Sequence, residues 1–532
     1  MTLDPLTRQL VWDRLLALVE EQAQTLMRTA FSTVVREAGD LSAGVFDPRG
    51  RMLAQAVTGT PGHVNAMAAS VGKFLRRFPV LEPGDVLLTN DPWDGTGHLN
   101  DFTVVTPVFH RDQCVALFAA TSHIADVGGR GFGPEANELY EEGLRIPITP
   151  LFRRGELDET LLTLIRANVR DPQVAEGDLL SLTACNETGA ARLLETLEEF
   201  DLADLTEIGE HIVTTSQRAM QAAIAALPDG CVTNHLTIDG YDEPLTLRCQ
   251  LQVQGEALHI DFAGAPPASR YGINVPLPYT EAYASFGVRC LVGGSIPNNA
   301  GSLAPISVTA PAGSLLAAEA PSAVSARHAV GQMLPDLVLG ALANILPDRA
   351  PTEGASCIWN PVLRGRGFVI NPIFNGGTGA RPQPEALGGG KDGLSTTAFP
   401  SGVRTTSTEV NEATAPLVFW HRQLAVGSGG TGLLRGGDGQ RIVIAHREQE
   451  PFYVSHMFDR VHHPAAGRAG GGAGAPGRVE LQSPGQYRAL GPKGFDEVPA
   501  GVQLVLQTPG GGGFGRAPNF EPQPAEPERH DD

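Results

Sequence analysis

Cysteine is scarce in this chain, and each of its six cysteines stands alone in the sequence. No two of them form a CxxC pair, which a thiolate zinc cluster requires, and their spacing gives no disulfide framework. The sequence therefore argues against both kinds of site and favours a reducing compartment. The cysteines are Cys114, Cys185, Cys231, Cys249, Cys290 and Cys357.

The sequence also shows neither a signal peptide nor a membrane-spanning segment. The first residues, Met1-Thr-Leu-Asp-Pro, have neither the basic nor the apolar region of a signal peptide. The longest apolar stretch, residues 330–346, is interrupted by Pro335 and Asp336 and is not suited to a bilayer. We therefore expect a cytoplasmic protein without a membrane partner.

Basic residues are too few for a protein that binds nucleic acid. The chain has 39 Lys and Arg against 59 Asp and Glu, a formal net charge of -20. A field of this sign repels a phosphate backbone. We expect no nucleic-acid partner.

Nucleotide-binding and serine-nucleophile motifs are absent as well. Residues 427–432 match GxGxxG by letter, but no helix is predicted after them, as the dinucleotide fingerprint needs. Lys391 follows Gly390, but Asp392 comes next and Glu385 stands where a P-loop begins with glycine. There is no GxSxG elbow either. We therefore expect no nucleotide or organic cofactor site in this chain.

Glycine and proline are abundant, with 63 and 41 residues, which indicates many turns and shaped loops. A chain of 532 residues exceeds one compact core. We predict a multi-domain α+β fold with helices, mixed or antiparallel sheets and a glycine-rich β-type C-terminal region. The expected parts are an N-terminal α+β domain carrying the candidate metal site (residues 1–225), a middle α+β domain (226–440), the glycine-rich β region (441–515) and a disordered tail (516–532).

Hydrophobic periodicity predicts the main elements. Helices are expected over residues 5–30, 64–78 and most of 157–227, and a buried helix over 320–346. A hairpin is expected over residues 40–55 and an antiparallel sheet over 230–265. The glycine-rich residues 465–477 suggest a mobile loop, and residues 509–515 an ordered segment packed on the body.

The densest polar cluster of the sequence runs from Asn90 to Asp101. His98 and Asp101 form an HxxD pair directly before an apolar strand, and the next strand ends near His123. If the two strands pair as a hairpin, His123 comes close to this pair, and Asp91 lies a short distance upstream. Two imidazoles with one or two carboxylates suit zinc, manganese or ferrous iron, and neighbouring glycines favour an open, catalytic geometry.

Other interpretations of these residues stay open at this point. Asp and His at loop ends are common turn and capping residues. Asp126 is either a ligand or a carboxylate that orients His123, or acts as a base, and no further catalytic residue is predicted. We expect His63, in Pro61-Gly-His, to be a loop residue that lines the site at most.

Several ordered motifs, spread over about residues 4–516, resemble the hydantoinase B/oxoprolinase family. They are Arg36-Glu-Ala-Gly-Asp-Leu-Ser-Ala-Gly-Val-Phe-Asp, the cluster from Asn90 to Asp101, His123-Ile-Ala-Asp-Val-Gly-Gly, Glu142-Gly-Leu-Arg-Ile-Pro, Pro297-Asn-Asn-Ala-Gly, Ser428-Gly-Gly-Thr-Gly-Leu-Leu-Arg-Gly-Gly and Pro509-Gly-Gly-Gly-Gly-Phe-Gly. One departure is Gly427, where the family pattern has Asp. The family includes N-methylhydantoinase B, the C-terminal half of 5-oxoprolinase and subunits of acetone and acetophenone carboxylases.

The resemblance implies a division of labour between subunits. A separate A-type subunit with an actin-like ATPase fold uses ATP to activate the substrate carbonyl or bicarbonate, and the B-type chain completes the reaction at a metal. It also implies a hetero-oligomer that contains a dimer of this chain, and manganese in the carboxylase relatives. His98, Asp101 and His123 match as metal ligands, with Asp91 as the fourth and Asp126 as an alternative.

Three functions follow from this resemblance, and the residues do not choose among them. The leading one is ATP-dependent hydrolysis of a cyclic amide such as a hydantoin, 5-oxoproline or another lactam. The second is ATP-dependent carboxylation of a ketone. The third belongs to another class, a non-catalytic scaffold for the ATPase subunit.

Overall fold

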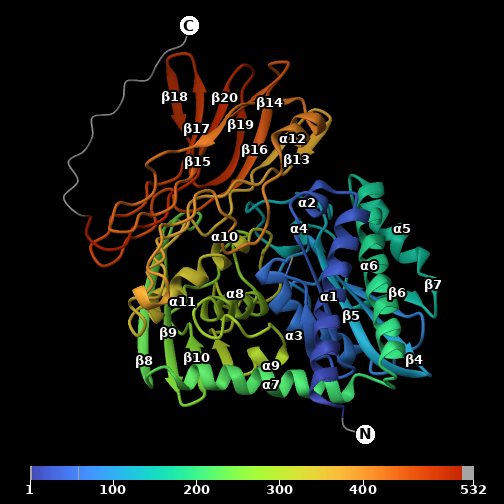
Figure 1. Cartoon of the computed structure of the whole chain (residues 1–532). Helices are drawn as coiled ribbons and strands as arrows, with labels where there is room; N and C mark the ends of the chain where they lie inside the picture. Colours follow the sequence, from blue (N-terminus) through green and yellow to red (C-terminus); the bar gives the residue numbers. More distant parts are fainter. Residues whose placement is uncertain (1–2, 58, 518–532) are drawn as a thin grey trace.

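The computed structural model describes residues 3–57 and 59–517, which form three packed regions of helices and mostly antiparallel sheets (Figure 1). The predicted multi-domain α+β fold is confirmed. Among the helices of these residues, none combines the length and the apolar character of a membrane span. Most of the expected tail, residues 518–532, lies outside the described part of the chain.

The N-terminal region is built on a seven-stranded antiparallel sheet. Helices α1 (Pro5–Thr29) and α6 (Pro172–Glu199) cover one face, and α3 (Pro61–Arg77) covers the other. The strand order is β2 (Met52–Gln55), β1 (Leu41–Phe46), β5 (Gln113–His123), β4 (Asp101–His110), β3 (Val86–Thr89), β6 (Thr149–Arg153) and β7 (Glu156–Leu157). The remaining helices are α2 (Thr33–Arg36), α4 (Leu139–Glu142), α5 (Glu159–Asn168) and α7 (Thr206–Ala225).

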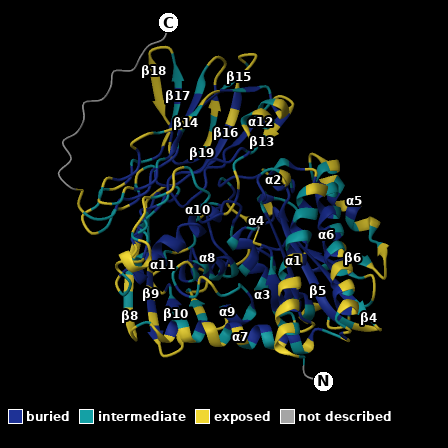
Figure 2. Cartoon of the chain, in the orientation of Figure 1, coloured by how far each residue is buried: buried dark blue, intermediate teal, exposed yellow. Residues whose placement is uncertain are grey.

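Successive residues of the central strands pack into opposite layers of this region. Val104 and Phe118 belong to the core under α1 and α6, whereas Val105 and Leu117 belong to the core under α3. Side chains alternate between the two faces of a strand. Since helices cover both faces, β4 and β5 are almost wholly buried (Figure 2), which explains why they are near-continuous apolar runs in the sequence.

The middle region holds a four-stranded sheet covered by helices α8 (Leu277–Arg289) and α11 (Leu334–Leu342). The prediction of one helix over residues 320–346 is wrong in its length. The chain instead forms α10 (His328–Gly331) and then α11, which has Pro335 in its first turn, where no backbone N–H is needed. The sheet order is β11 (Ile306–Thr309), β10 (Ala257–Asp261), β9 (Leu245–Gln254) and β8 (Gly230–Ile238), and α9 (Ala300–Leu303) precedes β11.

The C-terminal region is a sandwich of two sheets that share one apolar core. The boundary expected at residues 440 and 441 does not match it, because β14 and β15 pair across this point. One sheet is β13 (Phe368–Ile370), β12 (Val362–Gly365), β16 (Phe452–Met457) and β19 (Lys493–Val498). The other is β14 (Leu417–Leu424), β15 (Gln440–His446), β20 (Gln503–Gln507), β17 (Arg478–Ser483) and β18 (Gln486–Ala489); η1 (Glu385–Leu387) and α12 (Thr408–Thr414) lie in the loops.

Beside the sandwich, five glycine-rich segments without regular strands pack together; we call residues 375–381, 390–395, 428–439, 465–475 and 508–515 the glycine bundle (Figure 1). Backbone hydrogen bonds join the segments, as from Gly437 N to Thr378 O at 2.9 Å and from Gly472 N to Thr431 O at 2.6 Å. Residues 465–477 were expected to form a mobile loop. Backbone hydrogen bonds instead join this segment to neighbouring segments of the glycine bundle, which corrects that prediction. Residues 509–515 are ordered and packed, as predicted.

Candidate metal centre

The ends of two neighbouring strands bring the predicted ligands together. Strand β4 begins at Asp101, β5 ends at His123, and the register places these two residues directly opposite each other. His98 lies in the turn before β4, after Gly97, which has φ +101°. A side chain at Gly97 would lie 2.7 Å from Arg327 Nε, so the turn requires glycine for both conformation and space.

His98, Asp101 and His123 form a buried cluster whose ligand atoms all lie within 4.8 Å of one another. Asp101 Oδ1 is 2.7 Å from His98 Nε2 and 3.5 Å from His123 Nδ1. Ligands about 2.1 Å from one tetrahedral ion are about 3.4 Å apart. The spacing is therefore of the order that a divalent ion needs.

The hydrogen bond of His98 determines which of its nitrogens is free to bind a metal. Nδ1 lies 2.9 Å from the carbonyl oxygen of Ser325, which only accepts, so Nδ1 carries the proton. Burial, followed by Arg327, lowers the pKa of His98 to about 4, so the ring is neutral. The lone pair of Nε2 then faces the carboxylate oxygen of Asp101. Two acceptors at this distance suit a cation between them, so the donor set fits a divalent metal.

The second oxygen of Asp101 is held by protein donors. Thr96 Oγ1 donates to Oδ2 at 2.8 Å, His63 Nε2 lies at 2.9 Å, and the guanidinium of Arg327 also binds it. Although burial opposes ionisation, the neighbouring His63 and Arg327 hold the pKa of Asp101 well below its usual value. Asp101 is therefore ionised, with Oδ2 fixed and Oδ1 directed at the two histidines.

Glu142 stabilises the peptide that orients His98 in the cluster. Its Oε1 accepts the backbone N–H groups of Val324 and Ser325, each at 2.7 Å, and Ser325 in turn accepts from His98. Burial raises the pKa of Glu142 to about 8, despite these two bonds. The Glu142 carboxyl thus fixes the peptide that orients His98.

Replacing Glu142 with glutamine is expected to flatten the pH dependence of stability. The pKa of Glu142 is higher in the folded state (about 8) than its ordinary 4.5, so its stabilising contribution is complete below pH 4.5 and is lost as pH rises through 8. At about 1.4 kcal/mol per unit, this loss is at most roughly 5 kcal/mol. Glu142→Gln keeps the acceptor oxygen and cannot ionise.

Thermal unfolding of the wild type and Glu142→Gln between pH 5 and pH 9 measures this difference. The melting temperature of the wild type should fall more steeply with pH. Glu138→Gln, at an exposed position nearby, is the matched control and should follow the wild type. Parallel curves for the wild type and Glu142→Gln would contradict the assignment.

The cluster opens onto a small cavity of about 30 Å³ where the three regions meet. This volume has room for about one or two water molecules. Phe132 covers the cluster with its ring edge-on to His98 and His123, at centroid distances of 5.7 and 5.1 Å. The lining also includes Asp40, Tyr279, Arg327, His328, Asn360, Ile373 and Val403.

Asp91 does not lie in this cluster, although the sequence pattern predicted it as the fourth ligand. Its Oδ2 is bound by Arg145, with Nη2 at 2.6 Å and Nε at 2.7 Å, and its Oδ1 accepts the backbone N–H of Trp93. Asp91 therefore shapes the loop before β4. The further carboxylate that does line the cavity is Asp40, at the start of β1, whose Oδ1 accepts from Thr60 Oγ1 at 3.0 Å.

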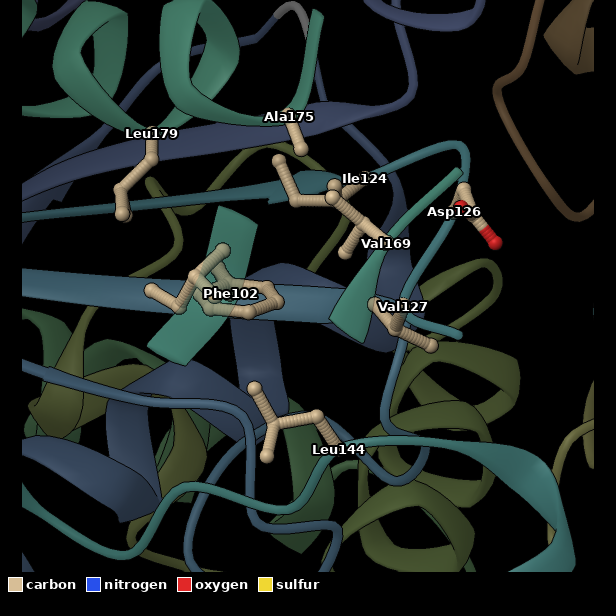
Figure 3. Close-up of a pocket in the computed structure, with 9 residues that line it drawn as sticks. Phe102, Ile124, Asp126, Val127, Leu144, Val169, Ala175 and Leu179 are labelled. Carbon is tan, nitrogen blue, oxygen red and sulfur yellow. The ribbon is translucent and has the colours of Figure 1, made fainter. Parts of the chain in front are cut away.

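Asp126 also lies away from the cluster. Arg170 Nη1 binds its Oδ1 at 2.5 Å, and Gly128 N donates to the same oxygen. Figure 3 shows the carboxylate of Asp126 directed away from a small apolar cavity lined by Phe102, Ile124 and their neighbours. The expected contact between Asp126 and His123 is not formed, and the carboxylate beside His123 is that of Asp101.

His63 is not a loop residue, contrary to the prediction. Pro61 begins α3, so His63 lies in the first turn of that helix and is buried against Asp101. Burial opposes protonation, but the carboxylates of Asp101 and Asp40 raise the pKa of His63. Proline before this histidine was the available signal for a helix start. Arg327 and His328 had no comparable signal, because they reach the site from more than 200 residues away.

Comparison with known proteins identifies the family of this chain. The family model described as hydantoinase B/oxoprolinase matches residues 4–517. The chain belongs to the hydantoinase B/oxoprolinase family. The resemblance inferred from the sequence motifs is confirmed.

Relatives of this family member differ in length. It is 30% identical to 5-oxoprolinase 1 of Arabidopsis thaliana over 94% of this chain, but it spans only 41% of that protein. It is 28% identical to an uncharacterized protein of Methanocaldococcus jannaschii, covering 96% of this chain and 91% of that one. A Pseudomonas protein named as the B component of a putative D-/L-hydantoinase is 27% identical over 82% of this chain and 77% of its own length.

Two solved structures share the fold. The ATP-dependent caprolactamase from Pseudomonas jessenii superposes with a TM-score of 0.88 at 24% identity, over 97% of this chain and 92% of that chain. An acetone carboxylase structure superposes with a TM-score of 0.85 at 17% identity, over 96% and 76%. At these identities the likeness shows the architecture.

Proposed function

We propose that this chain is the metal-dependent, catalytic B-type subunit of an ATP-dependent cyclic amide hydrolase. The observation that carries the proposal is the buried cluster of His98, Asp101 and His123, in which the free lone pair of His98 faces a carboxylate. Family membership and the named relatives support ring opening of a hydantoin, 5-oxoproline or another lactam.

In this proposal the side chains would hold a divalent ion and water in a small, preorganised cavity. His98 and His123 each offer a ring nitrogen, and Asp101 offers one oxygen while Arg327 and Thr96 hold the other. A divalent ion held there would supply a Lewis acid for the carbonyl oxygen and for water. Phe132 excludes bulk solvent, which strengthens the electrostatic interactions inside.

Activation of the substrate is assigned to a partner with an actin-like ATPase fold. The sequence has no P-loop or dinucleotide motif. Amide resonance makes a lactam resistant to water, and transfer of the ATP γ-phosphoryl group to the carbonyl oxygen removes that protection. Two molecules of water then complete the reaction: one adds at the phosphorylated carbon and leads to cleavage of the C–N bond, and the other releases phosphate to leave the ring-opened amino acid. We propose that the chain acts in a hetero-oligomer with this ATPase.

We expect the purified chain alone to hydrolyse neither ATP nor 5-oxoproline nor hydantoin. Combining it with an actin-like ATPase subunit should produce ATP-dependent ring opening, followed by phosphate release and by chromatography of the product. The ATPase subunit alone is the control and should not open the ring. ATP turnover by the contaminant-free chain alone would contradict the proposal.

Assays of the chain combined with its ATPase partner also distinguish the ketone carboxylase and the non-catalytic scaffold from the hydrolase. A requirement for bicarbonate, with a ketone consumed and no ring opening, would identify a carboxylase. A chain that holds no metal and whose variants at His98 and Asp101 leave the activity of the assembly unchanged would identify a scaffold. Only the scaffold predicts that these side chains act merely as turn residues.

A further inference from the structure

A second and larger cavity, of about 370 Å³, lies next to the candidate metal centre. The first turn of α3 takes part in both, because Thr60 and His63 line the small cavity and Pro61, Val64 and Asn65 line the large one. The loop before α12 also reaches both, through Gly402 and Val403. Small-molecule sites in proteins usually have about 300–1,000 Å³, so the larger cavity has the size for a ligand and the smaller one does not.

Arg289, at the end of α8, brings an unpartnered positive charge to this cavity. Its Nη2 donates to the backbone carbonyl of Ile296, but its Nη1 is buried and has no hydrogen-bond partner among the described residues. Arg289 also forms no ion pair there, whereas the buried Arg327 and Arg460 are each bound to carboxylates. In a chain with a formal net charge of -20, a half-buried arginine without a carboxylate indicates a place for an anion from outside.

Asn298 adds a hydrogen-bond acceptor. Its Nδ2 donates to Asn65 Oδ1 at 2.8 Å, and Asn65 Nδ2 donates to Ser285 Oγ at 3.2 Å, so this chain of amides has a fixed direction. The remaining atom, Asn298 Oδ1, is buried without a partner among the described residues. It therefore suits a ligand that brings its own N–H.

Gln55 also lines the cavity, and most of the remaining wall is apolar. The rings of Phe286 and Phe399 lie 5.9 Å apart at 40°, and Val64, Ala398 and Pro400 continue this surface. Such walls suit a small ring more than an extended polar chain. The cavity therefore combines an oxyanion donor, an N–H acceptor and a surface for a ring.

We propose that this cavity binds a small cyclic amide that carries an oxyanion, with Arg289 Nη1 donating to the oxyanion and Asn298 Oδ1 accepting the ring N–H. The oxyanion is either a carboxylate of the substrate or the phosphate added during activation. The proposal rests on the proposed function and names the substrate class for it. It places the ring beside the His98–Asp101–His123 cluster, on the other side of the first turn of α3.

Isothermal titration of the full chain with three probes tests this assignment: 5-oxoproline, 2-pyrrolidinone (the same ring without the carboxylate) and inorganic phosphate. We expect 5-oxoproline or phosphate to bind, and Arg289→Met to weaken that binding about 10- to 100-fold, as expected for loss of a charge-assisted hydrogen bond. Binding of 2-pyrrolidinone should not change in this variant. Tighter binding of 5-oxoproline than of 2-pyrrolidinone identifies the carboxylate, and binding of phosphate alone identifies the activated species.

Arg349→Met is the matched control, because Arg349 is exposed and its Nη2 donates to the nearby Leu291 carbonyl. Asn298→Asp keeps the size of the side chain, places a negative charge in the cavity and should also weaken binding of the anion. Melting temperatures show that the variants are folded. The proposal is overturned if no probe binds the wild type, or if Arg289→Met binds all probes as the wild type does.

Metal content measured on the same samples separates this proposal from the proposed function. A chain that binds 5-oxoproline through Arg289 but holds no metal would remove the catalytic proposal and keep the anion site. A chain that holds a metal at His98 and His123, but that binds the probes equally well with and without Arg289, would remove the anion site and keep the catalytic proposal.

Discussion

Replacing His98 or His123 with alanine is expected to remove the bound divalent metal and to abolish activity of the reconstituted complex, while the chain stays folded. Each substitution removes one of the two ring nitrogens that face Asp101 Oδ1. His98→Ala also leaves the Ser325 carbonyl without its donor, at a cost of about 1–3 kcal/mol. The apolar layers on both faces of the sheet are untouched.

Metal analysis of the purified variants, with melting temperature and lactam turnover, measures this effect. His235→Ala, on the exposed side of β8, is the matched control and should keep metal and activity. Asp91→Asn should keep the metal too, because Asp91 is bound by Arg145 and not by the cluster. A full metal complement in both His98→Ala and His123→Ala would contradict the site.

The hairpin that forms the centre of the site was predictable because it is local in sequence. Strands β4 and β5 are neighbouring apolar runs joined by a short turn, and their pairing places Asp101 opposite His123. His98 stands three residues before Asp101, so the turn before β4 brings it to the same place. The family motifs pointed to the same three residues.

The rest of the site depends on contacts that no local pattern reveals. Arg327 and Ser325 reach Asp101 and His98 from the middle region, over more than 220 residues of sequence. Asp91 was chosen for its closeness in sequence, but Arg145 competes for it in the folded chain. Asp40 stands nearly 60 residues before the cluster and lines the cavity only because β1 pairs with β5.

Strand pairing also decides how the chain is organised around residue 440, where a domain boundary was predicted. The predicted boundary lies between residues 440 and 441, whereas the sheets are defined by pairing of β14 with β15 and of β12 with β16. The glycine-rich segments were equally ambiguous, because glycine suits both a mobile loop and close backbone packing. Only the hydrogen bonds between segments distant in sequence decide between the two.

Replacing Gly511 with alanine is expected to cause one of the largest losses of stability available from a single methyl group in this chain. An added Cβ would lie 1.9 Å from Thr378 O and 2.3 Å from Thr378 C, both of them backbone atoms of another segment of the glycine bundle. Gly511 also donates to Gly437 O at 3.0 Å and accepts from Gly430 N at 2.8 Å, so no segment can move without breaking these bonds.

Overpacking and the lost backbone hydrogen bonds together should lower the free energy of unfolding by about 3–5 kcal/mol. Calorimetric or denaturant unfolding of Gly511→Ala measures it. Gly491→Ala in the same region is the matched control, because the nearest atom to its added Cβ is 3.7 Å away and it should unfold like the wild type. Equal stability of the two variants would show that the segments of the glycine bundle can move apart with little loss of unfolding free energy. The glycines would then not be required for the close approach of the segments.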